Sequence, residues 1–87
     1  MEEQAPGIIR KILIVEDDAF LSDMYQTKFL SAGYEVHIAL DGEQCLEKLK
    51  NGFRPDVILL DIVMPRLDGI ETLSAIKKNE ATKNIPV

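Results

Sequence analysis

Two apolar runs of this chain each end in acidic residues. Residues 12–15 are followed by three acids at 16–18, and residues 57–60 are followed by Asp61. Short runs rich in Ile, Val and Leu predict strands that are buried on both faces of a parallel sheet. Ligands of such sheets bind outside the carboxyl ends of the strands. We therefore expect these acids to share one pocket, where their repulsion favours a hard cation such as Mg²⁺.

The composition limits what kind of protein this is. The chain has 87 residues, a formal net charge of -5 and 46% hydrophobic residues, which is enough for one small domain. We expect a flexible N-terminal tail at residues 1–7 and a single folded domain at residues 8–87. The acidic balance argues against direct binding of nucleic acid. No apolar stretch is long enough to span a membrane.

The expected location is the cytoplasm. The start of the chain lacks the basic residues and the apolar middle of a signal peptide. Its one cysteine, Cys45, has no partner for an internal disulfide, so nothing indicates an oxidising compartment.

Strands and helices are expected to alternate along the chain. We predict strands at 11–15, 34–39 and 56–60, helices at 19–32, 43–50 and 69–79, and the start of a fourth strand at 85–87. Asp18 is placed to cap the first helix, and Gly33 to end it. A βαβαβαβ order with short connections predicts a parallel sheet with right-handed crossovers.

The spacing of apolar residues predicts which side of each helix faces the sheet. In the first helix we expect Leu21, Met24, Lys28 and Phe29 to face inward, with Ser22 outward. In the second helix the expected inward residues are Cys45, Leu46 and Leu49, and in the third they are Ile70, Leu73 and Ile76. His37 is expected to be structural.

Three motifs stand out along the chain: the strand and acids of residues 12–18, the segment 57–65 with Asp61 followed by Met64 and Pro65, and Asp68-Gly69. Together they resemble the receiver domain of two-component response regulators. The segments 39–42 and 84–87 also look like that family. The resemblance covers essentially the whole chain after the tail. It implies a partial flavodoxin-like α/β fold with a parallel sheet of strand order 2-1-3-4.

The resemblance also implies a role for individual residues. Asp61 matches the aspartate that accepts a phosphoryl group from a histidine kinase or a phosphotransfer protein. Asp17 matches the carboxylate that binds Mg²⁺ directly, and Glu16 the acid that reaches the metal through water. The backbone carbonyl of Val63 matches the main-chain metal ligand. Asp68 is interpreted as a helix cap.

Other positions of the family's pattern lie beyond Val87. A complete receiver has five strands and five helices, with a Ser or Thr after strand four and a Lys after strand five, so the chain is expected to be a truncated receiver that lacks the last helix-strand-helix. Such a domain would leave part of its sheet bare. The sequence therefore also predicts self-association, as a two-fold dimer.

Two functions stay open at this point. One is a phosphorelay acceptor, not an enzyme, that uses Asp61 and Mg²⁺. The alternative is a non-switching receiver fragment that acts as a self-associating interaction module. An aspartate-nucleophile phosphatase is disfavoured because Val63 stands where such enzymes need a second aspartate. A nucleotide or flavin site is disfavoured because no Gly-rich loop follows the first strand.

Overall fold

The computed structural model describes residues 10–61 and 69–87. Strands and helices alternate, and the predicted α/β class is confirmed. The elements in chain order are β1 (Lys11–Val15), α1 (Ala19–Ser31), β2 (Glu35–Ala39), α2 (Gly42–Lys50), β3 (Val57–Leu60) and α3 (Gly69–Lys78). The expected tail at residues 1–7 lies outside the described part of the chain.

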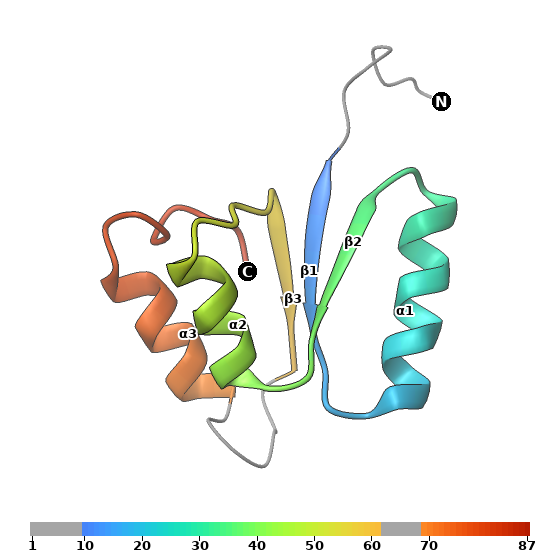
Figure 1. The fold of residues 1–87 in the computed structure, drawn as a ribbon, viewed down its shortest axis with the longest axis horizontal. Helices are drawn as coiled ribbons and strands as arrows, with labels where there is room; N and C mark the ends of the chain where they lie inside the picture. Colours follow the sequence, from blue (N-terminus) through green and yellow to red (C-terminus); the bar gives the residue numbers. More distant parts are fainter. Residues whose placement is uncertain (1–9, 62–68) are drawn as a thin grey trace.

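The three strands form one parallel sheet in the order β2-β1-β3. This confirms the predicted order of the first three strands. The sheet is the middle of three layers: α1 covers one face, and α2 and α3 cover the other (Figure 1). Helices lie on both faces because both faces of β1 are apolar, and residues 12–15 are all buried.

The predicted fourth strand is not present as a regular element. Residues 85–87 have no strand assignment, although the N–H of Ile58 donates to the carbonyl of Pro86 at 2.9 Å. Pro86 has no N–H to return such a bond. The segment therefore lies beside β3, where a fourth strand was expected. It is joined to β3 by this backbone hydrogen bond and does not continue as a regular strand.

Two side chains hold this segment in place after α3. The hydroxyl of Thr82, which is buried, donates to the carbonyl of Ile76 at 2.8 Å. The ammonium of Lys77 donates to the carbonyls of Lys83 at 3.1 Å and Ile85 at 2.9 Å. These bonds satisfy carbonyls at and beyond the helix end, which would otherwise lack partners.

The local signals at the helix ends behave as predicted. The carboxylate of Asp18 accepts from the N–H groups of Phe20 at 2.8 Å and Leu21 at 3.2 Å, so Asp18 is the N-cap of α1. Gly33 and Gly52 follow α1 and α2 with φ of 92° and 101°. This left-handed backbone favours glycine.

The core lies between the sheet and the pair α2 and α3. Cys45 and Leu49 of α2 are buried there as predicted, with Leu46 partly buried beside them. Burial raises the pKa of the Cys45 thiol to about 11. His37 is structural in this arrangement: its Nε2 lies 2.6 Å from a carboxylate oxygen of Glu35, and its ring packs on Phe53 at 4.4 Å.

The predicted inward face of α3 is partly wrong. Ile76 is buried, but Ile70 is 65% exposed and Leu73 is 36% exposed. Gly69 and Thr72 are buried instead. Helix α3 is therefore rotated so that Gly69 and the hydroxyl-bearing Thr72 pack inward. Apolar spacing alone did not decide between the two sides.

The same kind of error occurs in α1. Met24 was expected in the core and is 49% exposed, whereas Ser22, expected outward, is buried. Leu21, Tyr25 and Phe29 are half-buried, and the Phe29 ring meets Tyr34 edge-on at 5.4 Å. Only one helix covers this face among the described residues, so its contact with the sheet is narrow.

A matched pair of substitutions tests the orientation of α3. Ile76→Ala removes a fully buried side chain and is expected to lower the free energy of unfolding by about 2–4 kcal/mol. Leu73→Ala, one turn away on the partly exposed side, is expected to cost less than about 1 kcal/mol. Urea unfolding followed by circular dichroism measures both. Equal losses in the two variants would contradict this orientation.

Candidate functional site

The acids meet because of strand register. Val15 at the end of β1 pairs with Ala39 of β2 on one side and with Leu60 of β3 on the other. The next residue on each strand continues the pairing: the N–H of Glu16 donates to the carbonyl of Ala39, and that of Asp61 to the carbonyl of Val15, both at 3.1 Å. Parallel strands thus deliver Glu16 and Asp61 to the same edge of the sheet.

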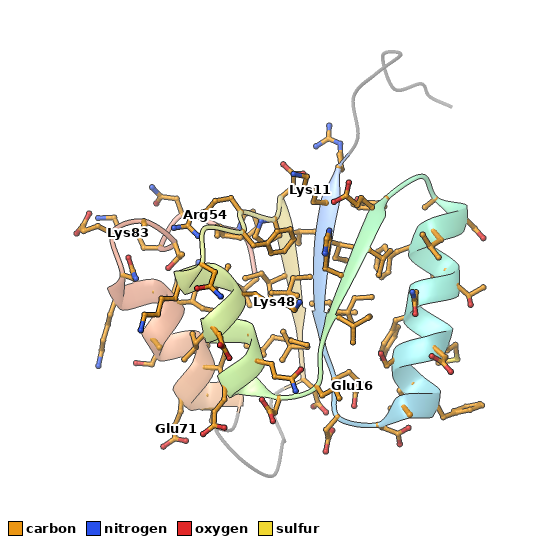
Figure 2. The ribbon with its side chains drawn as sticks, viewed as in Figure 1. Lys11, Glu16, Lys48, Arg54, Glu71 and Lys83 are labelled. Carbon is orange, nitrogen blue, oxygen red and sulfur yellow. The ribbon has the colours of Figure 1, made fainter. Side chains whose placement is uncertain are left out.

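Three carboxylates gather at this edge. Glu16, Asp17 and Asp61 each offer an oxygen, and these oxygens all lie within 4.8 Å of one another. Glu16 is only 5% exposed, Asp61 is half-buried and Asp17 is exposed. Figure 2 places Glu16 at the end of the sheet where β1 leads into α1. The sequence predicted these three residues to come together, and they do.

The cluster fits a hard divalent cation. Mg²⁺ takes oxygen ligands at about 2.0–2.1 Å, so two oxygens on opposite sides of the ion lie about 4 Å apart. A spacing of at most 4.8 Å closes to that distance with a small side-chain rotation. Val63, whose carbonyl was predicted as a further ligand, lies outside the described residues, as do Met64, Pro65 and Asp68.

Asp18 does not join the cluster. Its side chain is occupied by the N-cap bonds of α1, and its own N–H donates to Glu16 Oε2 at 3.2 Å. Asp18 therefore fixes one oxygen of Glu16 and the start of α1 at once. The carboxylate of Glu16 is in this way tied to the backbone beside the site.

The metal-free cluster carries an electrostatic cost. Burial raises the pKa of Glu16 above its ordinary value of 4.5, the N–H of Asp18 opposes this, and the charges of Asp61 and Asp17 raise the pKa further. Like charges disfavour ionisation, and a cation between them removes that penalty.

Two features of the site escaped the sequence analysis. Phe20, in the first turn of α1, is 76% exposed next to the acids. A hollow of about 400 Å³ runs from Glu16 and Asp61 along the sheet, where Leu21 and Tyr25 of α1 line it. Exposure of a large apolar side chain carries no local sequence signal, since Phe20 fits an inward helical position equally well.

The pKa of Glu16 sets a pH dependence. A carboxyl whose pKa is raised by folding favours the folded state when protonated, and this contribution is lost as pH rises from 4.5 through the raised value. Glu16→Gln is therefore expected to unfold at a higher temperature than the unsubstituted protein at pH 7 in EDTA. The stability advantage of Glu16→Gln should shrink at pH values below the ordinary pKa of 4.5.

Thermal unfolding at several pH values measures this difference. Glu47→Gln, which removes a carboxylate from an exposed position of α2, is the matched control and should gain less stability at pH 7. A stability difference for Glu16→Gln that is constant with pH would refute the assignment.

Comparison with known proteins agrees with the geometry. A family model described as the response regulator receiver domain matches residues 12–87. Protein PilG of Pseudomonas aeruginosa is 37% identical over 87 residues, which is all of this chain and 62% of PilG. The transcriptional regulatory protein CpxR of Escherichia coli (strain K12) is 38% identical over 74 residues, covering 85% of this chain and 31% of CpxR.

Solved structures give the same result. The N-terminal domain of a response regulator receiver protein from Methanoculleus marisnigri JR1 is 44% identical with a TM-score of 0.83, covering 88% of this chain and 62% of that one. Chemotaxis protein CheY4 of Vibrio cholerae is 34% identical with a TM-score of 0.84, covering 91% and 65% respectively.

The chain thus spans less than two thirds of the length of each of these proteins. Among the described residues, no helix is long and apolar enough to cross a membrane. The β2-β1-β3 sheet with its three helices is a partial flavodoxin-like fold. From the match over residues 12–87 and the acids at the end of the sheet, the chain belongs to the response regulator receiver domain family.

Proposed function

We propose that this receiver domain accepts a phosphoryl group on Asp61 from a histidine kinase or a phosphotransfer protein. The observation that carries the proposal is the convergence of Glu16, Asp17 and Asp61 within 4.8 Å at the carboxyl edge of a receiver-type sheet. Family membership supports a part in two-component signalling. The site in this chain supplies the carboxylates that such a transfer needs.

The chemistry assigns a part to each acid. A carboxylate oxygen of Asp61 attacks phosphorus, the bond from phosphorus to the donor breaks, and the donor group leaves with the bonding electrons. A bound Mg²⁺ would neutralise the phosphoryl oxygens during this step. Asp17 and the Val63 carbonyl would hold that ion directly, and Glu16 through water.

Two features of the site suit a protein donor. The half-burial of Asp61 leaves it accessible from the edge of the sheet, and the exposed ring of Phe20 lies at the start of the helix beside it. Met24, one turn further along α1, is 49% exposed as well, and contiguous exposed apolar surface commonly marks where a partner docks. This domain would act as a phosphoacceptor in signalling and not as an enzyme on a separate substrate.

The alternative function also has an observation in its favour. The hollow beside α1 exposes part of the sheet near Leu59 and Leu60 of β3, a surface that a second copy of the chain would cover. Dimerisation through this face stays a prediction. A self-associating module that no longer switches would not need Asp61 to react, so phosphorylation separates the two functions.

Phosphoryl transfer is tested by intact mass spectrometry after incubation with acetyl phosphate and Mg²⁺. The unsubstituted protein is expected to gain one phosphoryl group, and Asp61→Asn none. Asp18→Asn is the matched control, since asparagine also caps helices well, and it should still be modified. A folded, unmodified protein would reject the acceptor role and favour the interaction module.

Metal binding is tested separately by calorimetry. Asp17→Ala is expected to weaken Mg²⁺ binding at least about tenfold, because it removes one carboxylate from a small set of oxygen ligands. Asp23→Ala, on the outer side of α1 and away from the cluster, should bind Mg²⁺ as the unsubstituted protein does. Equal affinity in Asp17→Ala would remove Asp17 from the metal site.

A further inference from the structure

Positive charge in this acidic chain is concentrated in two segments. Residues 46–54 and 75–83 carry six basic residues against two acidic ones, whereas the rest of the chain carries four against thirteen. The first segment is the end of α2 with the loop after it, and the second is the end of α3 with its loop. Helix α3 packs against α2, so the two basic segments are neighbours.

The helix dipole does not explain this concentration by itself. Cations are favoured at every helix C-terminus, yet the last turn of α1 holds only Lys28. The last turns of α2 and α3 hold two lysines each, and the loops that follow add Arg54 and Lys83. The excess is therefore specific to the α2 and α3 side.

A groove lies between these two helix ends. It measures about 480 Å³, and its apolar lining includes Leu46, Leu49, Ala75 and Ile76. Lys50 and Arg54 line it as well, together with Asn79 and Thr82. A concave apolar surface with a few polar groups is the usual form of a binding site, and here the charged groups on it are both cationic.

Two hydrogen bonds hold the guanidinium of Arg54 in position beside the groove. Its Nη1 donates to the carbonyls of Leu49 at 2.7 Å and Phe53 at 2.8 Å. An arginine has five N–H donors, and these two bonds use only one of its three nitrogens. A guanidinium fixed in this way loses little freedom when a carboxylate binds to it.

The groove is remote from the acid cluster. Figure 2 shows Arg54 and Lys83 at one end of the molecule, and Glu16 and Glu71 at the other. The helices run between the two ends, because each begins near the carboxyl edge of the sheet and ends near its amino edge (Figure 1). A ligand in the groove would leave the acid cluster open.

We infer that the groove between α2 and α3 is a docking site for a short acidic segment of a partner protein. One apolar side chain of that segment lies in the groove against the partly buried Leu46 and Ala75, and carboxylates beside it meet Lys50 and Arg54. The apolar lining favours such a segment over a nucleic acid or an anionic membrane, whose phosphates would use the cations and leave the groove unfilled.

The probe is a short synthetic peptide with two adjacent leucines flanked by aspartates and glutamates. It is titrated into the ¹⁵N-labelled full chain. The expected result is saturable change in the amide signals of Leu46, Leu49, Ala75 and Asn79. Peptides with asparagine and glutamine for the acids, or serine for the leucines, are expected to bind at least about tenfold more weakly.

Substitutions then test whether the peptide binds in the groove. Lys50→Glu reverses one cation of the groove, and Ala75→Glu puts a carboxylate on its lining, so each should weaken binding at least about tenfold. Lys28→Glu makes the same charge reversal at the end of α1 and should bind normally. No signal changes, or equal weakening by Lys28→Glu, would overturn the inference.

Two competing ligands and two variants complete the test of the docking site. Tighter binding of a DNA duplex or an anionic lipid vesicle at the same amides would also overturn the inference. Asp61→Asn should bind the peptide normally, and Lys50→Glu should still be phosphorylated by acetyl phosphate. Failure of the docking site is in this way distinguished from failure of the phosphoacceptor function.

Discussion

The parallel pairing of β1 with both of its neighbours is the constraint on which the rest of the molecule depends. Once Val15 lies between Ala39 and Leu60, the residues that follow each strand are brought to one edge of the sheet. A shift of one residue in either pairing would turn side chains to the opposite face and separate Glu16 from Asp61. The buried run at residues 12–15 therefore fixes the site as well as the core.

That constraint has an energetic consequence. The sheet holds Glu16, Asp17 and Asp61 near one another whether or not a cation is present, and Glu16 is buried among like charges. Such an arrangement opposes folding of the metal-free protein. Groups arranged at a cost to stability are characteristic of functional sites. Asp18 partly offsets the cost, since its backbone N–H donates to Glu16 while its side chain caps α1.

The sequence predicted the strands and the acid cluster because the signals for both are local. An apolar run followed by acids predicts a buried strand that ends at a polar edge, and three strands ended as expected. Orientation of the helices was harder. For α3 the sequence offers Ile70 and Leu73 on one side and Thr72 on another, and the packed structure buries Thr72. Contacts with other elements decide this, and spacing along one helix contains no information about them.

The charge distribution follows from the same parallel topology, with one exception. The helices α1, α2 and α3 run back from the carboxyl edge to the amino edge of the sheet (Figure 1). The acids in the first turns of α2 and α3 and the lysines in their last turns are therefore separated along the molecule. The exception is that the two faces of the sheet differ in the number of basic residues at their helix ends. Helix α1 has the same direction as α2 and α3, yet its last turn holds a single lysine. Topology accounts for the polarity of the molecule but not for that difference. An anionic partner at the α2 and α3 groove would account for both the excess charge and its position beside apolar side chains.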